Sequence, residues 1–172
     1  HDRRSLDRRP EHRPLRSRHE GHVEMRDAVT FASRVALEHR ATLERLLFFN
    51  RCQDRVARGI VDVIDRFGPP EIQPDGEWLR VQVAGLSGVQ SLFALEATSG
   101  RPIGVAVYMR ADLEHVTVLH LGLSEEFCAG GEREGWRLLL RLLKEIRRSS
   151  RRVKGVRRMS VLYGAQRSRA QA

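Results

Sequence analysis

Cysteine is scarce in this sequence, which contains only Cys52 and Cys128 among its 172 residues. The two cysteines form no CxxC pair, and neither lies near a histidine at the spacing that metal ligands require. The sequence therefore predicts neither a zinc site nor a disulfide framework. We expect both thiols to be reduced, and we expect Cys52 to be a small core residue rather than a reactive one.

Long apolar runs are also missing. No segment approaches the roughly 18 consecutive apolar residues of a membrane helix, and none near the start has the form of a secretion signal. Aromatic residues make up only 6% of the chain, a poor match for the stacking platforms that bind single-stranded nucleic acid. The sequence contains no Gly-x-Ser-x-Gly, Walker A or HExxH motif and no cluster of paired carboxylates. We therefore expect a soluble, cytoplasmic protein with no membrane partner and no bound metal.

Positive charge, in contrast, is abundant: 31 Lys and Arg residues against 22 Asp and Glu give a net charge of +9. Residues 1–19 carry seven arginines against three acids and almost nothing apolar, so residues 1–22 are expected to form a disordered basic arm. Residues 133–158 carry eleven basic residues against two acids. This second cluster either attracts nucleic acid or another polyanion, or is the solvated face of an arginine-rich protein.

The first half of the folded chain has a helical pattern. Apolar residues recur every three or four positions from about Val23 to Phe67, which predicts two or three helices. The last run ends at Gly68-Pro69-Pro70, a C-cap glycine followed by prolines that cannot extend a helix. A chain of this length and apolar content is expected to fold as one domain, over residues 23–164, with a flexible tail over residues 165–172.

In the second half of the folded chain, apolar and polar residues alternate. After Gly76 the apolar period changes to two, which predicts four strands joined by short turns as an antiparallel meander, at Trp78–Val83, Ser91–Ala97, Ile103–Arg110 and His115–Leu123. A helix from Glu132 to about Arg152 follows, and its pattern buries Trp136, Leu139, Leu140, Leu143 and either Ile146 or Arg147. A fifth strand, Val156–Tyr163, completes a right-handed crossover and should lie parallel to the fourth. The predicted fold class is α+β: N-terminal helices, then a mainly antiparallel meander with a β-α-β crossover.

One part of this pattern resembles a known family. The segment "GRPIGVAVYMRADLEHVTVLHLGLSEEF", the leucine-rich helix after it and "KGVRRMSVLY" resemble the central part of GNAT-type N-acetyltransferases, over roughly residues 77–163. The resemblance implies acetyl-coenzyme A held between the fourth and fifth strands, with the backbone around Leu121 and Leu123 pairing with the pantetheine arm. It further implies a pyrophosphate at the start of the following helix, near Gly130, Gly131, Arg133 and Gly135.

The turn "CAGGEREGW" departs from the family's pattern. Unpaired amides and the positive end of the helix dipole favour an anion at a helix N-terminus. This turn, however, has no basic residue directly after Phe127, and it carries Glu132 and Glu134, which suit the dipole themselves and repel a pyrophosphate. Arg133 and Arg137 could offset that repulsion. The turn is therefore either a phosphate cradle or a tightly packed corner.

The catalytic groups are harder to assign. Acyl transfer to an amine needs a base near the fourth strand, and His115 with neighbouring Glu114 is the candidate, with a packed sheet histidine as the alternative. Family members also carry a tyrosine acid on a helix after the fifth strand. This chain ends about nine residues after Tyr163, so we expect that segment and the last strands to be missing. Either the chain is truncated, or a partner supplies the segment, or the domain is no enzyme.

Two functions from different classes follow. The first is transfer of an acetyl group from acetyl-coenzyme A to the amine of a small molecule or protein. The second is a non-catalytic module of the same fold that binds an acidic partner or nucleic acid through its basic helix. Strand edges left open by the missing segment also predict self-association, as a homodimer.

Overall fold

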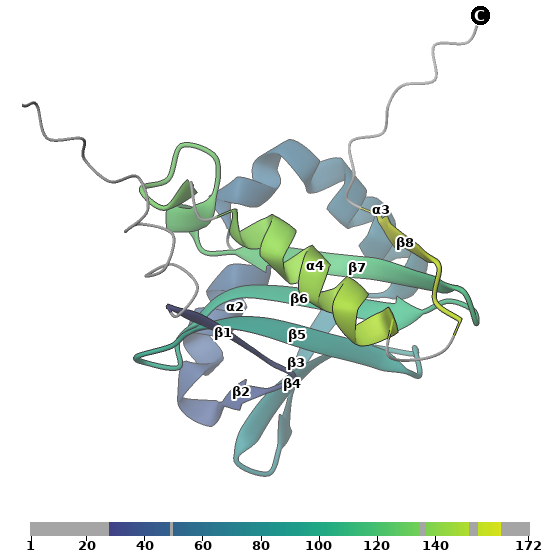
Figure 1. Cartoon of the computed structure of the whole chain (residues 1–172), viewed down its shortest axis with the longest axis horizontal. Helices are drawn as coiled ribbons and strands as arrows, with labels where there is room; N and C mark the ends of the chain where they lie inside the picture. The colour runs from purple at the N-terminus through teal and green to yellow at the C-terminus, as the bar shows by residue number, and fades with distance from the viewer. Residues whose placement is uncertain (1–27, 49, 135–136, 152–154, 163–172) are drawn as a thin grey trace, which may run out of the picture.

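The fold is described from a computed structural model, which covers residues 28–48, 50–134, 137–151 and 155–162 (Figure 1). The predicted basic arm of residues 1–22 and the predicted tail of residues 165–172 lie outside these ranges. The described chain is α+β, as predicted, with α-helices on both sides of a mixed sheet and a second, smaller sheet.

The main sheet has five strands in the order β1-β5-β6-β7-β8. These are β1 (Val29–Ala32), β5 (Val89–Glu96), β6 (Pro102–Arg110), β7 (His115–Leu123) and β8 (Arg158–Val161). The first four pair antiparallel, whereas β7 and β8 pair parallel. The predicted crossover from the fourth strand through a helix to a parallel fifth strand is therefore confirmed.

The smaller sheet has the order β2-β4-β3, with β2 (Val35–Ala36), β3 (Pro70–Asp75) and β4 (Trp78–Val83). The prediction of one meander was wrong for β4, which pairs with β3 and β2 instead of β5. Gly76, with φ 63°, makes a tight turn that lets β4 pair with the segment just before it. Sequence reasoning missed β3 because it contains two prolines, which are tolerated at the edge of a sheet, where β3 lies.

Three α-helices are described: α2 (Arg40–Phe48), α3 (Ala57–Phe67) and α4 (Leu138–Arg151). Short 3₁₀ segments accompany them: η1 (Leu37–His39), η2 (Arg51–Val56) and η3 (Glu125–Phe127). The predicted end of the second helical run is confirmed, because Gly68 has φ 94° and its N–H donates to the carbonyl of Ile64 at 2.8 Å.

The helical prediction was wrong for residues 29–36. This segment forms β1 and β2, and β1 pairs with β5 from Val29↔Glu96 to Ala32↔Phe93. The few apolar residues of this segment fit a strand as well as a helix. The strand is favoured because β1 can pair with β5, which is largely buried.

The helix after β7 also differs from its prediction. It begins at Leu138, six residues later than the predicted Glu132, and its buried residues are Leu138, Leu142, Ile146 and Ser150. Leu139 and Leu140 face outward, and 58% of Leu140 is exposed. Leucines at 138–140 and 142–143 allow two overlapping apolar stripes, so periodicity alone could not choose between them. Trp136 lies outside the described residues.

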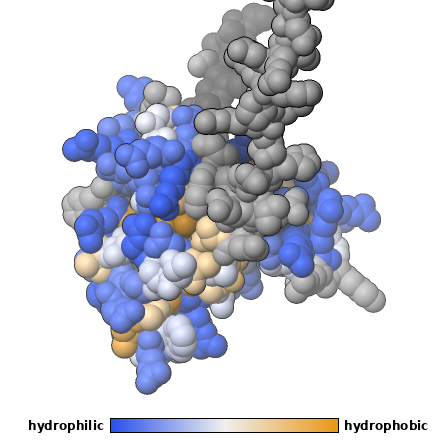
Figure 2. Space-filling view, turned by 60° about the vertical axis from the view of Figure 1, so that its left-hand side comes forward, coloured by the Kyte–Doolittle hydropathy of each residue, from blue (hydrophilic) through white to orange (hydrophobic). Residues whose placement is uncertain are grey.

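The core lies on both faces of the main sheet. In Figure 1, α4 crosses one face, while α2 and α3 lie on the other. Buried side chains form two clusters accordingly, one that includes Leu43, Val63 and Phe93 and one that includes Leu138, Leu142 and Ile146. On the face shown in Figure 2, hydrophilic residues surround a smaller hydrophobic area. Among the described helices, none has both the length and the apolar content to cross a membrane.

Helix α2 packs closely on β7 at Gly122. A β-carbon added there would collide with the main-chain carbonyl of Leu46. We therefore expect Gly122→Ala to lower the free energy of unfolding by about 2–3 kcal/mol, because those main-chain atoms move only with the helix. Gly104→Ala is the comparison: its β-carbon would lie 3.0 Å from the end of the Leu142 side chain, which can rotate away. Urea unfolding measures both, and equal midpoints would contradict this packing.

Candidate functional site

Strand β7 is paired on both sides only over its first half. Its parallel pairs with β8 run from His115↔Arg158 to Val118↔Val161, whereas its antiparallel pairs with β6 continue to Leu123. The β6–β7 register shifts next to Val118, which leaves Leu119 as the extra residue of a bulge. Bulges bend a strand and increase its twist. From Leu119 onward, β7 therefore has no neighbouring strand on its β8 side within the described chain.

Side chains from η2 and its cap cover this open half of β7. Gln53 donates from Nε2 to the carbonyl of Leu121 at 3.1 Å, and Asn50 donates from Nδ2 to the carbonyl of Leu123. Asn50 is only 9% exposed, and its Oδ1 accepts a hydrogen bond from the N–H of Cys52 at 2.9 Å. The two β7 residues predicted to pair with pantetheine thus already accept hydrogen bonds from amide groups.

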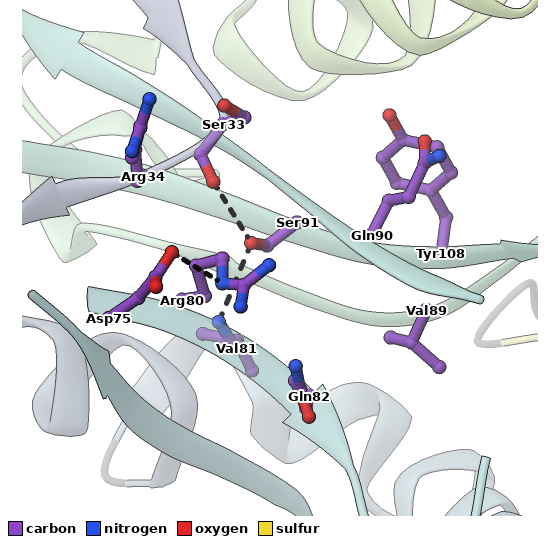
Figure 3. Close-up of a pocket in the computed structure, with 10 residues that line it drawn as sticks. All are labelled: Ser33, Arg34, Asp75, Arg80, Val81, Gln82, Val89, Gln90, Ser91 and Tyr108. Carbon is purple, nitrogen blue, oxygen red and sulfur yellow. Dashed lines mark hydrogen bonds and ion pairs between the residues drawn. The ribbon is translucent and has the colours of Figure 1, made fainter. Parts of the chain in front are cut away.

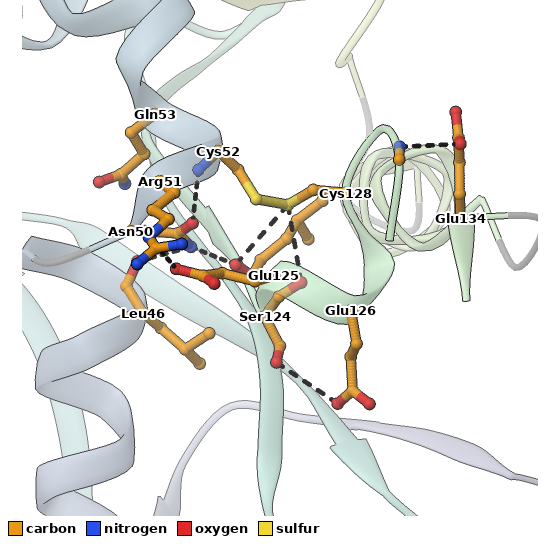
Figure 4. Close-up of a disulfide and its surroundings, with 12 residues drawn as sticks. Leu46, Asn50, Arg51, Cys52, Gln53, Ser124, Glu125, Glu126, Cys128 and Glu134 are labelled. Carbon is orange, nitrogen blue, oxygen red and sulfur yellow. Dashed lines mark hydrogen bonds and ion pairs between the residues drawn. A yellow bond between two sulfur atoms is a disulfide. The ribbon is translucent and has the colours of Figure 1, made fainter. Parts of the chain in front are cut away.

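A disulfide fixes η2 in this position (Figure 4). Cys52 of η2 is bonded to Cys128, which follows η3, with a Cα–Cα distance of 6.1 Å. The prediction of two reduced thiols was therefore wrong. The cysteines are 76 residues apart and match no local motif, and only the fold brings the α2–α3 connection beside the turn after β7. Disulfides persist mainly in oxidising compartments and are rare in the cytoplasm. The cytoplasmic location therefore stays a prediction, and the disulfide does not support it.

The turn after β7 has the geometry of a corner. Its amides bond within the turn: Gly130 to Glu134 Oε2, Gly131 to the Cys128 carbonyl, Arg133 to the Glu126 carbonyl and Glu134 to the Gly131 carbonyl. A β-carbon at Gly131 would lie 2.5 Å from two main-chain carbonyl oxygens. Since α4 begins only at Leu138, these glycines are not at its N-terminus. Gly135 lies outside the described residues.

Arg133 is held by carboxylates rather than left facing a cavity. Its guanidinium lies 3.6 Å from Glu96 and 3.8 Å from Glu126, and Arg101 contacts the same two carboxylates. A hydrogen bond from the Ser99 hydroxyl, together with hydrogen bonds and charge from Arg101, lowers the pKa of Glu96. This network ties the β5–β6 hairpin to the turn, so Arg133 would have to leave two carboxylates to reach an anion.

The predicted base lies far from the predicted cofactor site. His115 begins β7, with its Nε2 2.9 Å from the Ser160 hydroxyl, and Glu114 lies 3.9 Å from Arg157. Leu121 is six residues further along, or about 20 Å at the rise of a strand. A general base must reach the transferred proton directly or through one water. The fold therefore does not bring His115 and Glu114 together with Leu121 and Leu123.

His120 is the buried histidine of β7, next to the bulge. It is 3% exposed, and burial lowers its pKa to about 4, although a backbone hydrogen bond with Gly68 acts in the opposite direction. The sequence pattern of β7 predicted no role for His120. Asn50 and Gln53 were also missed, and the only signal for them was a polar segment between two helical runs, which suggests a cap.

Within the described ranges, no group of three or more His, Cys, Asp or Glu side chains could hold a metal ion.

Loss of the disulfide should destabilise the fold. We expect the Cys52→Ser/Cys128→Ser protein to unfold with a free energy about 4 kcal/mol lower than wild type, because the unfolded chain regains the freedom of a long closed loop. Urea unfolding with and without reductant tests this. Reductant should lower the midpoint of wild type and leave the double variant unchanged. A wild-type midpoint insensitive to reductant would contradict the bond.

Buried His120 should make stability depend on pH. Because its pKa is lower in the folded protein than the ordinary 6.5, the unfolded chain binds the proton first as the pH falls. Stability from this residue is therefore complete above pH 6.5 and decreases toward pH 4. We expect the His120 contribution to fall by about 2 kcal/mol between pH 7 and pH 5. Between pH 7 and pH 5, the free energy of unfolding of His120→Gln should therefore decrease by about 2 kcal/mol less than that of wild type. Equal decreases in the two proteins would contradict the burial of a neutral histidine.

Comparisons with known proteins add no further assignment to this geometry. Neither the models of known protein families, nor the curated proteins, nor the solved structures contain a match to the chain.

Proposed function

We propose that this protein is a GNAT-like acyltransferase that binds acetyl-coenzyme A along the open half of β7 and transfers the acetyl group to an amine. The order of elements supports the proposal. A strand, two helices, a three-stranded antiparallel meander, a helix and a parallel strand follow one another as β1, α2, α3, β5–β7, α4 and β8. The hairpin of β3 and β4 is inserted between α3 and β5.

The strongest support comes from the hydrogen bonds at the edge of β7. An extended chain with amide groups can add to an open strand edge as a further strand would. The carbonyls of Leu121 and Leu123 face this edge and accept from the side-chain amides of Gln53 and Asn50. The pantetheine arm carries amide N–H groups of the same kind, so it can replace these donors one for one.

The residues fit the pantetheine arm better than the pyrophosphate. The amides of the turn over residues 130–134 are bonded within it, and Arg133 is paired with two carboxylates. The proposed contacts with the cofactor are therefore confined to β7. The cofactor would supply an activated thioester, and the β7 carbonyls would orient the arm that carries it. No residue is assigned as the base, because His115 lies about 20 Å along the strand from Leu121.

The alternative function, binding of an acidic partner or nucleic acid through the basic helix, has one observation in its favour. The exposed side of α4 carries Lys144, Arg148 and Arg151, and only Glu145 provides an acid within the helix. Binding of this kind weakens steeply with salt, because the partner releases its counterions.

Isothermal titration with acetyl-coenzyme A tests the proposal. Gln53→Ala should bind the cofactor about fivefold more tightly than wild type, since it no longer occupies the Leu121 carbonyl. The matched control is Gln73→Ala, because Gln73 is an exposed glutamine of β3, in the smaller sheet, whose side-chain amide donates to Glu71. Its affinity should equal that of wild type.

Two further steps make the outcome decisive. The Cys52→Ser/Cys128→Ser protein is titrated in parallel, because release of η2 should also strengthen binding. Release of free coenzyme A thiol in the presence of a panel of amines then measures transfer. No binding by any of these proteins up to millimolar cofactor would reject the proposal. Equal gains in Gln53→Ala and Gln73→Ala would place the cofactor somewhere other than β7.

A further inference from the structure

A groove runs along the last turn of α4, at the end of β7 opposite to Leu123. Its outer part has a volume of about 510 Å³ and is lined by the starts of β7 and β8 and by the polar side chains of Arg147, Ser150, Arg151, Arg158 and Ser160. An inner recess of about 90 Å³ shares Ser150 and Val116 with the outer part and reaches Tyr108. We call the two parts together the α4 groove.

The recess continues into a second cleft between the two sheets. Gln90 and Tyr108 line both spaces, and they are register partners on β5 and β6 (Figure 3). The cleft itself is less suited to an anion, because its Arg80 is paired with Asp75 at 3.2 Å. The α4 groove is therefore the better candidate for an anion site.

Two largely buried residues with hydroxyl groups line the recess. Tyr108 is 8% exposed and Ser150 is 9% exposed. Neither hydroxyl makes a hydrogen bond to another residue in the described part of the chain. Neither hydroxyl oxygen is fully enclosed by protein, so each can bond to a water or to a polar ligand in the recess. Burial raises the pKa of Tyr108, so its hydroxyl stays a donor at neutral pH.

The mouth of the groove is strongly cationic. Arg147, Arg151 and Arg158 line it and are exposed, and no ion pair joins them to any acid of the described residues. Arg157 also lines the groove, and it lies 3.9 Å from Glu114. The negative end of the α4 dipole favours cations at this position and explains part of the cluster. It does not account for the two hydroxyl groups that line the inner recess.

We propose that the α4 groove binds a phosphorylated small molecule, with the phosphate held by the hydroxyls of Tyr108 and Ser150 and by the guanidinium groups of Arg147 and Arg151. Guanidinium groups supply donors only, and the two hydroxyls can each donate as well, which matches an anion with several acceptor oxygens. A phosphate monoester carries close to two negative charges at neutral pH and so suits several cations better than a carboxylate does. The outer volume lies in the range of small-molecule sites, about 300–1,000 Å³.

Titration with inorganic phosphate, glycerol 3-phosphate and adenosine 5′-monophosphate tests this inference, with acetate and an oligothymidylate as comparison ligands. We expect a phosphate monoester to bind and acetate not to bind. Tyr108→Phe and Arg151→Gln should each weaken that binding by about tenfold, because each loses a hydrogen bond to a charged group. Tyr108→Phe keeps the ring in the core, and Ser150→Ala gives a second test of the recess if Tyr108→Phe unfolds.

Arg148→Gln is the matched control. Arg148 lies in the same part of α4 but pairs with Glu145 at 3.7 Å and does not line the groove. Its replacement should change affinity by less than about twofold. Three results would overturn the inference. These are no binding of any phosphate at millimolar concentration, an equal loss in Arg148→Gln and Arg151→Gln, and oligothymidylate binding that is tighter than monoester binding and insensitive to Tyr108→Phe.

Discussion

The incomplete pairing of β7 is the constraint on which the other features depend. This strand lies beside β6 over nearly its full length but beside β8 only as far as Val118. Its second half would therefore expose main-chain carbonyls in the middle of the molecule. An unsatisfied buried carbonyl costs about 1–3 kcal/mol, so the fold has to supply donors from somewhere else.

Those donors come from side chains rather than from another strand. Asn50 and Gln53 stand at the start of a short 3₁₀ segment, which alone would have little reason to remain in place. The disulfide to Cys128 and the close approach of α2 at Gly122 hold the segment against β7. Covalent and packing constraints are thus concentrated where the sheet lacks a neighbour. An edge covered by side chains can also be uncovered without breaking a strand pair, which a strand partner would not permit.

Sequence reasoning succeeded where a local signal agreed with the final environment. The full extent of β7, its parallel alignment with β8 and the C-cap at Gly68 were predictable, because alternation, crossover handedness and glycine chemistry are local or general rules. It failed where the structure is set by contacts between residues that lie far apart in the chain. The disulfide, the pairing of β1 and the cover over β7 depend on contacts that no spacing encodes. The buried stripe of α4 was missed because its adjacent leucines support two stripes at once.

The disulfide also divides the chain into a closed ring and two arms. Residues 52–128 form the ring, which contains α3, the β3–β4 hairpin and the β5–β7 meander. Helix α4 and strand β8 belong to the arm that follows it. Opening of this arm would expose the buried Leu138, Leu142 and Ile146 of α4 and would leave the covalent ring closed. Because the α4 groove lies between that arm and the ring, any ligand held there would tie together the two parts of the molecule that no covalent cross-link joins.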